Sequence, residues 1–367
     1  MSPEKEFLYG SATGIGSMPH QEISAALQLI KENLLCGPHW PQLPRLGGEE
    51  GFARQYLAPL IKLKIMGLKK GEALFFYDME EDWPEREQAF YELYLEAQEG
   101  AENEERVIEL FAFPRNGARG FYSFLEEDWS SQIVKPLFIK GQVSGPLSLG
   151  LQVTSGDGKA SFYHNNLRDI LVKSLALQAR FQIRALKKFS LPVVIFLDEP
   201  ALLSFGQSAY ASLSAEDISA SLEEIILAIR EEGGIAGVHC CSGVDWSVLF
   251  NLPFDIVNFD AYAYFDSLLV YAEEADSFLK RGGVLAWGLV PTSGTAVESE
   301  EIATLQEKFF HGIERLSKRG VAAELLRKQY MITPSCGTAT LSEAQAEKVY
   351  RLTSGLRNAL EKQKPFG

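Results

Sequence analysis

The sequence predicts a single (β/α)8 TIM barrel over residues 1–367, and three observations lead to this prediction. Short apolar runs of the β type alternate with long amphipathic stretches, which is typical of parallel strands joined by helices. Eight such runs can be found along the chain. Most of them end in polar residues, and enzymes with this fold place their chemistry at the carboxyl ends of the strands.

The predicted strands lie at about residues 11–16, 42–46, 136–142, 193–197, 235–239, 255–259, 284–288 and 330–333. Amphipathic stretches with helical spacing lie between them, at residues 23–35, 167–189, 218–232 and 300–318. The interval between the second and third strands is too long for one helix. We therefore expect about residues 73–134 to form an inserted segment that caps one end of the barrel, with an extra strand from Val107 to Phe113.

Composition excludes several classes of partner. The net charge of −14 argues against nucleic acid, whose phosphates require a basic surface. No apolar run approaches the roughly 20 residues needed to span a bilayer, and the segment from Met1 to Glu6 lacks the features of a signal peptide. Four cysteines without regular spacing indicate a reducing compartment rather than a disulfide framework. We expect a cytoplasmic protein that binds neither nucleic acid nor membrane.

The most informative motif is His239-Cys240-Cys241, at the end of the fifth predicted strand. Strand side chains alternate, so His239 and Cys241 should lie on the same side, where imidazole and thiolate suit zinc. Cys336, after the last predicted strand, is a third ligand candidate. Three ligands leave one coordination position open, which favours a catalytic zinc. Cys240 should point the opposite way and be structural, and Cys36 should be a core residue at a helix end.

Other polar residues follow the predicted strands. Asp198 ends the fourth strand and Asp260 the sixth, and Asp198 can be either a structural or a functional carboxylate. We expect the hydroxyl groups of Ser17, Ser144 and Ser242 to cap helices.

The segment Gly14-Ile15-Gly16 is not a dinucleotide fingerprint, because the third glycine is missing at the required spacing. Its glycines should instead let a substrate approach the backbone closely.

Taken in order, these motifs resemble the catalytic C-terminal half of cobalamin-independent methionine synthase, in the uroporphyrinogen decarboxylase/methionine synthase superfamily of barrels. The motifs that carry the resemblance are Ile15-Gly16-Ser17-Met18-Pro19, Ser144-Gly145-Pro146, Asp198-Glu199-Pro200-Ala201-Leu202, His239-Cys240-Cys241 and Pro334-Ser335-Cys336-Gly337. The resemblance implies that His239, Cys241 and Cys336 bind zinc. A glutamate ligand of the family is replaced here by Asp260, which is shorter by one methylene.

Two departures from the family concern the methyl donor. The family has a histidine after the seventh strand, thought to shuttle a proton, and the run from Trp287 to Thr292 has none. The 367 residues also hold no counterpart of the N-terminal half that helps to bind the folate donor. Both departures favour a methylcorrinoid, as free methylcobalamin or on a small corrinoid protein, over methyl-folate.

The resemblance implies transfer of a methyl group to a zinc-activated thiol, with Gly16 and Ser17 beside the substrate. Homocysteine, which would give methionine, needs an anion for its ammonium group, and Asp198 with Glu49 or Glu50 could supply one. Coenzyme M would need a cation for its sulfonate, and Arg45 is the nearest candidate.

Two further alternatives stay open. One is a non-catalytic thiol- or corrinoid-binding protein that senses its ligand. The other is a metal-free decarboxylase of the uroporphyrinogen type, which would need arginines that grip carboxylates and would leave the three predicted zinc ligands without a role.

Overall fold

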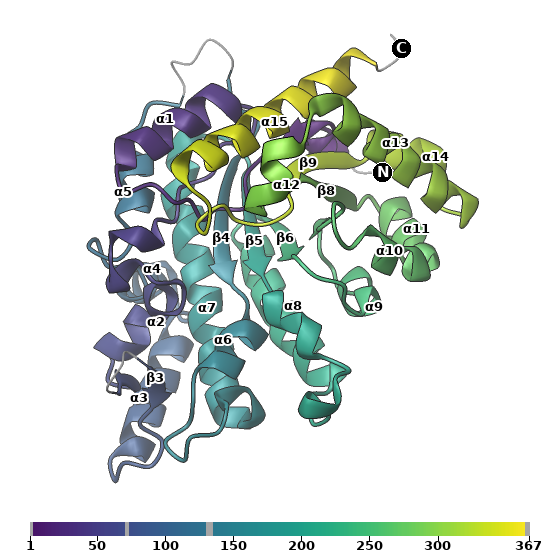
Figure 1. Ribbon diagram of the computed structural model, residues 1–367. Coiled ribbons are helices and arrows are strands. Elements are labelled where there is room, and N and C mark those ends of the chain that lie inside the picture. Colours follow the sequence, from purple (N-terminus) through teal and green to yellow (C-terminus); the bar gives the residue numbers. More distant parts are fainter. Residues whose placement is uncertain (1–2, 70–72, 130–134, 364–367) are drawn as a thin grey trace.

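The computed structural model describes residues 3–69, 73–129 and 135–363. Seven parallel strands form one sheet in the order β1-β9-β8-β7-β6-β5-β4, so the first and last strands of the chain are neighbours (Figure 1). The strands are β1 Ser11–Ala12, β4 Ile139–Ser144, β5 Val193–Asp198, β6 Ile235–Cys240, β7 Ile256–Phe259, β8 Val284–Val290 and β9 Tyr330–Pro334. The fold is therefore α/β, with the parallel sheet of a half-barrel, and seven of the eight predicted strands are confirmed.

The predicted second strand at 42–46 is wrong. Pro44–Leu46 is a short 3-10 helix, and the segment before it joins its neighbours only through isolated bridges, from Gln42 to Ser17 and from His39 to Lys140. Prolines at positions 38, 41 and 44 explain the irregularity, because proline has no backbone N–H to donate to a ladder. β1 and β4 are the two edges of the seven-stranded sheet. Among the described residues, residues 39–42 connect these edges by isolated bridges and form no regular strand.

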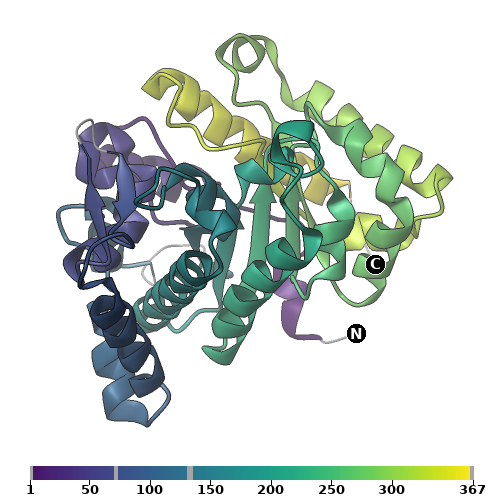
Figure 2. The same cartoon turned by 90° about the horizontal axis from the view of Figure 1, so that it is seen from below.

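The four predicted helices are confirmed as α1 Ile23–Asn33, α7 Asn165–Leu186, α8 Ala215–Glu231 and α13 Ile302–Lys318. Together with α15 Glu343–Lys362 they pack on the outer face of the sheet (Figures 1 and 2). The remaining helices are α2 Phe52–Lys62, α3 Trp83–Glu96, α4 Ala101–Leu110, α5 Arg119–Glu126, α6 Pro146–Gln152, α9 Trp246–Asn251, α10 Phe265–Leu268, α11 Ala272–Lys280, α12 Gly294–Ser299 and α14 Ala323–Lys328.

The long interval between the second and third predicted strands is mostly helical. It contains α3, α4, α5 and β3 Leu74–Phe76, which pairs antiparallel with β2 Met66–Leu68. The predicted strand from Val107 to Phe113 is wrong, because Val107 and Ile108 form the buried stripe of α4 instead. Helix α4 lies against α7, where Arg184 pairs with Glu104 at 2.8 Å. That this segment caps the barrel stays a prediction.

Side chains of the sheet alternate between two layers. Outward positions pack against the helices in the main core, whereas inward positions near the amino ends of the strands form a small apolar cluster inside the sheet. The inner cluster contains Leu8, Phe138, Val194, Phe196, Ile256, Val284, Ala286 and Met331. Farther along the strands the inward positions become polar. The buried polar residues there are Lys140, Gln142, Ser144, Asp198, His239, Asn258 and Thr333.

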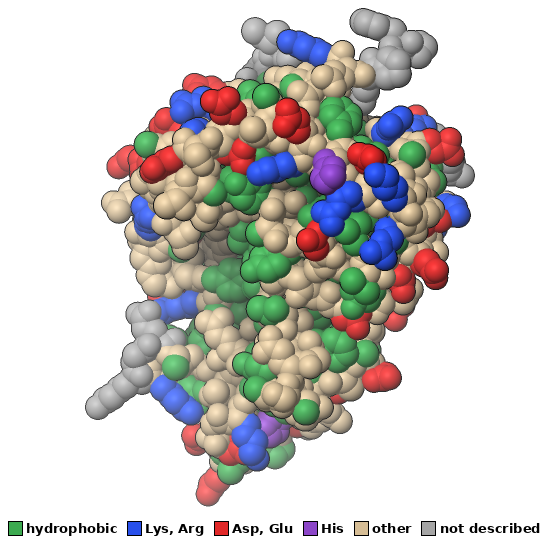
Figure 3. All heavy atoms as spheres, turned by 45° about the vertical axis from the view of Figure 1, so that its right-hand side comes forward, with side chains coloured by type: hydrophobic (Ala, Val, Ile, Leu, Met, Phe, Trp, Pro, Cys, Tyr) green, Lys and Arg blue, Asp and Glu red, His purple; other side chains and the backbone are tan. Residues whose placement is uncertain are grey.

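The surface is mixed in character. Figure 3 shows acidic and basic side chains interspersed over one face, with apolar side chains lining a hollow in it. Within residues 3–69, 73–129 and 135–363, every helix is too short or too polar to cross a bilayer.

Candidate metal centre

His239, Cys241 and Cys336 lie together at the carboxyl ends of the strands. His239 is the second-to-last residue of β6, Cys241 follows β6, and Cys336 follows β9. Their ligand atoms all lie within 4.8 Å of one another, although β7 and β8 separate the two strands in the sheet. Such convergence requires the sheet to curve, as in a barrel. The predicted clustering of the three residues is confirmed.

The burial and hydrogen bonding of the His239 imidazole suit it to act as a metal ligand. The ring is buried, and its Nδ1 hydrogen-bonds with Oδ1 of Asn258 on the neighbouring strand. Its Nε2 is buried and makes no hydrogen bond of normal geometry, although burial is outweighed by Cys241 and Asp198, which raise the pKa of the ring. A buried polar atom with no partner costs free energy, so it calls for an explanation. A metal ion bound at Nε2 would provide one, because neutral imidazole is a common zinc ligand.

The two thiols beside His239 have pKa values that are shifted in opposite directions. The pKa of Cys241 is lowered to about 4, first by a hydrogen bond from Cys336 and then by His239, while burial opposes the shift. The pKa of Cys336 is raised in turn, first by its hydrogen bond to Cys241 and then by burial, and the charge of the Cys241 thiolate adds to the shift. One thiolate, one thiol and an unpartnered imidazole nitrogen form a donor set that fits zinc, which would displace the remaining proton.

Asp260 is outside this group of three. It follows β7, and its Oδ1 accepts hydrogen bonds from the backbone N–H groups of Tyr262 at 2.9 Å and Ala263 at 2.8 Å. Burial raises the pKa of Asp260 to about 6, and the Cys241 thiolate contributes to the shift. Its carboxylate therefore lies near the thiols but holds the turn after β7. Direct ligation by Asp260 stays a prediction.

Asp198 lies beside His239 on the adjacent strand β5, and Ser144 lies beside Asp198 on the next strand, β4. Ser144 is in register with Asp198, which is in register with His239. Oδ1 of Asp198 and Oγ of Ser144 are both buried without a hydrogen-bond partner, like Nε2 of His239. Burial raises the pKa of Asp198 to about 6, although His239 and Lys140 oppose the shift. Three unpartnered polar atoms in one row indicate a site for a polar ligand.

Lys140 is a residue of the site that the sequence reasoning missed. It lies on β4 with its side chain fully buried, its Nζ donates to the carbonyl oxygen of Ile15, and it faces the Phe196 ring at 4.6 Å. Burial lowers the pKa of Lys140 to about 8, against the attraction of Asp198. A lysine within the apolar run from Leu137 to Val143 was the available signal. Asn258 was also missed, and an amide within the β7 sequence was its signal.

The other predicted substrate residues are placed differently. Glu50 is buried and accepts hydrogen bonds from the backbone N–H of Arg119 at 2.9 Å and its Nε at 3.0 Å. Glu49 pairs with Arg54. Arg45 donates to the carbonyl oxygen of Leu341 at 2.7 Å. The structure therefore gives each of these three charged groups a partner within the chain.

Gly16 and Ser17 lie next to the Cys336 loop. The backbone carbonyl of Ser17 accepts a hydrogen bond from the N–H of Thr338 at 2.8 Å. A Cβ on Gly337 would lie 2.0 Å from Oγ of Ser17, so the two loops touch at these positions. Gly16 has a φ of +149°, and a Cβ there would collide with the Gln142 side chain.

The predicted helix caps are wrong. The N-cap of α6 is Gly145 rather than Ser144, that of α9 is Asp245, and that of α1 is Glu22. Ser17 and Ser242 precede these caps by several residues, since each strand continues into a loop before its helix begins.

Glu199 holds the start of α6 instead. Its carboxylate accepts hydrogen bonds from the backbone N–H groups of Leu147 at 2.9 Å and Ser148 at 3.0 Å. Burial raises the pKa of Glu199 to about 7, against these hydrogen bonds.

The structural cysteines behave as predicted. Cys240 is fully buried in the outer core layer, and burial raises the pKa of its thiol to about 12. Cys36 packs against the same core two residues after the C-cap of α1, and its thiol donates to the carbonyl oxygen of Ala12 at 3.2 Å.

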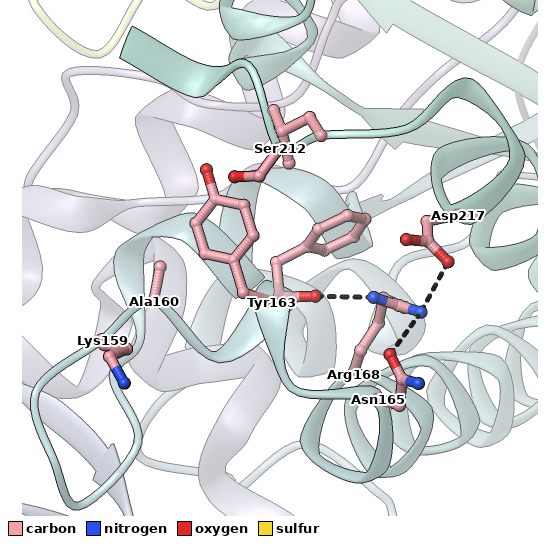
Figure 4. A pocket seen from close by; sticks show the side chains of 9 residues that line it. Lys159, Ala160, Tyr163, Asn165, Arg168, Ser212 and Asp217 are labelled. Carbon is pink, nitrogen blue, oxygen red and sulfur yellow. Dashed lines mark hydrogen bonds and ion pairs between the residues drawn. The ribbon is translucent and has the colours of Figure 1, made fainter.

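A separate cavity of about 550 Å³ lies at the start of α7 (Figure 4). Arg168 lines the cavity and donates hydrogen bonds to Asp217 at 2.7 Å and to Asn165 at 3.1 Å. Tyr163 and Ser212 line another side of it. None of the proposed metal ligands lines this cavity.

No family model matches the sequence, and no curated protein sequence matches it. Solved structures do match. One is a B12-independent methionine synthase from Shewanella sp. W3-18-1 in complex with selenomethionine, with a TM-score of 0.43 and 16% sequence identity. The match covers 61% of this chain and 62% of that one, so this chain spans less than two thirds of that protein's length.

Proposed function

We propose that this protein is a zinc-dependent methyltransferase that methylates the sulfur of a small thiol. The observation that carries the proposal is the convergence of His239, Cys241 and Cys336 within 4.8 Å at the carboxyl ends of the strands. The unpartnered Nε2 of His239 supports it, because that atom is available to a metal. The ordered motifs that resemble methionine synthases add independent support from the sequence.

Zinc bound at these residues would supply thiol activation, since coordination deprotonates a thiol whose pKa is otherwise near 8.5. The three protein ligands leave one position for the acceptor's sulfur. They also come from β6 and β9, on either side of β7 and β8: His239 lies within β6, and Cys241 and Cys336 follow one and two residues after the ends of β6 and β9. The chain therefore contributes a preorganised donor set rather than a general base.

Homocysteine is the acceptor that we favour. Its ammonium group needs an anion or hydrogen-bond acceptors. Asp198 Oδ1, on the strand next to His239, and Ser144 Oγ, one strand farther, are both unpartnered. Glu49 and Glu50, the other carboxylates considered, already pair with arginines. Asp198 is therefore the residue that we expect to select the amino acid, with Gly16 and Ser17 on the adjoining loop.

A methylcorrinoid is the better-matched donor. When the sulfur–carbon bond forms, the carbon–cobalt bond breaks, and its electron pair stays on cobalt as cobalt(I), which needs no proton. A methyl-folate leaving group does need one. The end of β8 and the residues that follow it, Leu289 to Thr292, include no histidine that could deliver it. Either free methylcobalamin or a small corrinoid protein could present the methyl group.

The test combines metal analysis with methyl-transfer assays. Anaerobically purified protein should contain about one zinc per chain, because one donor set is present among the described residues. Methionine should form faster from methylcobalamin than from methyl-folate, and homocysteine should be methylated faster than coenzyme M. Asp198→Asn should raise KM for homocysteine more than it weakens zinc binding. Asp276→Asn, on the outer helix α11, is the matched control and should leave KM unchanged.

Each part of the proposal can fail separately. Protein that holds no metal and does not respond to added zinc would refute the metal site. Faster turnover with methyl-folate would refute the donor. Bound zinc with no turnover of any thiol would favour a non-catalytic thiol- or corrinoid-binding protein.

A further inference from the structure

The structure assigns to Asn258 the role of positioning His239 for metal binding, with Thr333 as its anchor on the strand that carries Cys336. This inference rests on the proposed metal site and deepens it. Asn258 lies in β7, between the two strands that supply ligands, and both it and Thr333 are fully buried. It is in register with His239 on one side and with Ala286 on the other.

The hydrogen bonds of Asn258 determine which way its amide faces. Nδ2 donates to the backbone carbonyl oxygen of Ala286 at 2.8 Å and to Oγ1 of Thr333 at 2.7 Å. A carbonyl oxygen can only accept, so the atom that faces Ala286 must be the NH2 group. Oδ1 is then the atom that faces Nδ1 of His239.

The amide orientation in turn fixes the tautomer of His239. Because Oδ1 of Asn258 only accepts, Nδ1 of His239 must carry the hydrogen that joins them. In the neutral ring the lone pair then lies on Nε2, the atom that is buried without a partner. A hydrogen bond of this kind sets the tautomer and ring orientation of metal-binding histidines.

The same side chain also links the two halves of the donor set. Asn258 hydrogen-bonds to His239 on β6 and to Thr333 on β9, and these are the strands that precede Cys241 and Cys336. Cys336 is three residues after Thr333. The amide therefore helps to set the separation between the His239 and Cys336 ends of the site. A carboxylate could accept from His239 but could not donate to Ala286 and Thr333.

The first readout is metal affinity, measured with zinc and with cobalt(II) as a spectroscopic probe in competition with a chelator. Asn258→Leu should weaken binding by about 10- to 100-fold, the usual effect of removing a partner of a metal-binding histidine. Thr333→Val should weaken it less. Asn258→Asp, which keeps the acceptor for His239, should bind metal more tightly than Asn258→Leu.

The matched control is Gln329→Leu. Gln329 is a buried amide that donates to two backbone carbonyls, of Leu279 at 2.8 Å and Gly283 at 2.6 Å, just before β9 begins. Loss of the Gln329 amide should lower the free energy of unfolding, as loss of the Asn258 amide should. Unlike loss of the Asn258 amide, it should leave metal affinity unchanged. Equal loss of affinity in Gln329→Leu and Asn258→Leu would reduce Asn258 to a purely structural residue and overturn the inference.

The second readout needs no metal and no activity. The chain has five histidines, so 15N NMR of metal-free protein can resolve His239 once a His239→Gln variant has assigned its signals. At a pH high enough to keep the ring neutral in each variant, we expect hydrogen on Nδ1 in the wild type and in Asn258→Asp, and a mixture of tautomers in Asn258→Leu. Unchanged tautomers in Asn258→Leu would refute the positioning role. Wild-type protein that binds no metal would refute the proposed function, while this spectrum would still decide the role of Asn258.

Discussion

Cys240 and Cys241 are neighbours of the same residue type with opposite chemistry. Cys240 faces the apolar layer between sheet and helices, where burial raises the pKa of its thiol to about 12. Cys241 faces the inside of the sheet, where Cys336 and His239 lower its pKa to about 4. One step along the chain reverses the direction of the side chain, and the different surroundings on the two sides shift the two thiol pKa values in opposite directions.

This contrast makes the first prediction, which concerns zinc content. Cys241→Ala and Cys336→Ala should each lower zinc affinity by about 100-fold or more, because each loses a ligand, a larger loss than that of a ligand's partner. Cys240→Ala is the matched control and should keep stoichiometric zinc. The measurement is elemental analysis after anaerobic dialysis against a weak chelator. Zinc loss in all three variants would point to general destabilisation instead.

Lys140 makes a second prediction at the same scale, on the pH dependence of stability. Its pKa is about 8 when folded, because of burial, against 10.5 as the ordinary value. Between these pH values the unfolded chain binds a proton that the folded chain does not, so stability rises with pH there and is lowest below pH 8. Lys140→Met has no such group, so its free energy of unfolding does not change for this reason. The difference in free energy of unfolding between Lys140→Met and wild type should therefore fall by about 3 kcal/mol between pH 8 and 10.5.

Denaturant unfolding at a series of pH values measures this difference. Lys328→Met, at an exposed ion pair with Glu6, serves as a surface lysine for comparison. A difference between Lys140→Met and wild type that does not change over this pH range would contradict the prediction.

At the scale of elements, the loops that follow β1 and β9 are fitted to each other. Thr338 donates to the carbonyl oxygen of Ser17, and Gly337 leaves room for the Ser17 side chain. Cys336 immediately precedes Gly337, so this contact between two loops bears directly on the position of a metal ligand. The two strands are also paired in parallel.

The third prediction tests that contact. Gly337→Ala places a Cβ 2.0 Å from Oγ of Ser17, which should displace the Cys336 loop and cost about 1–3 kcal/mol of stability, with weaker zinc binding. Ser17→Ala removes the colliding oxygen and leaves the nearest side-chain atom at 3.3 Å. The double variant should therefore recover much of both losses. Zinc affinity and thermal unfolding of the four proteins form the test, and purely additive losses would show that the contact does not couple the loops.

At the scale of the whole molecule, the metal ligands come from strands that are far apart in sequence and separated by two others in the sheet. His239 and Cys336 are nearly 100 residues apart, and β7 and β8 lie between their strands. A metal ion held by both would link the sheet across its concave side. Binding to such a site couples to global folding, because the donor set does not exist in the unfolded chain.

The fourth prediction follows from that coupling. Zinc should raise the midpoint of thermal unfolding, and free zinc at 1,000 times its Kd should add about 4 kcal/mol to the free energy of unfolding. A chelator should reverse the effect. In Cys241→Ala the midpoint should no longer depend on zinc. A zinc-dependent midpoint that survives in this variant would place the stabilising metal elsewhere.

Local sequence determined much of this protein. The apolar runs and helical periodicities identify seven of the parallel strands and four of the major helices, because burial on both faces of a parallel sheet leaves a continuous apolar signal. Alternation along a strand suffices to place His239 and Cys241 on one side and Cys240 on the other. The segment at 42–46 and α4 were mispredicted, since prolines interrupt the first and the apolar residues of the second fit a helical stripe as well as a strand.

The tertiary structure alone decided which polar residues meet. No local signal shows that Glu50 faces Arg119 or that Asn258 joins His239 to Thr333. Each of these interactions depends on strand register and on the curvature of the sheet. Register follows from backbone pairing between segments that are distant in sequence, and curvature from the packing of all the helices around them, so neither can be read from one segment of the chain.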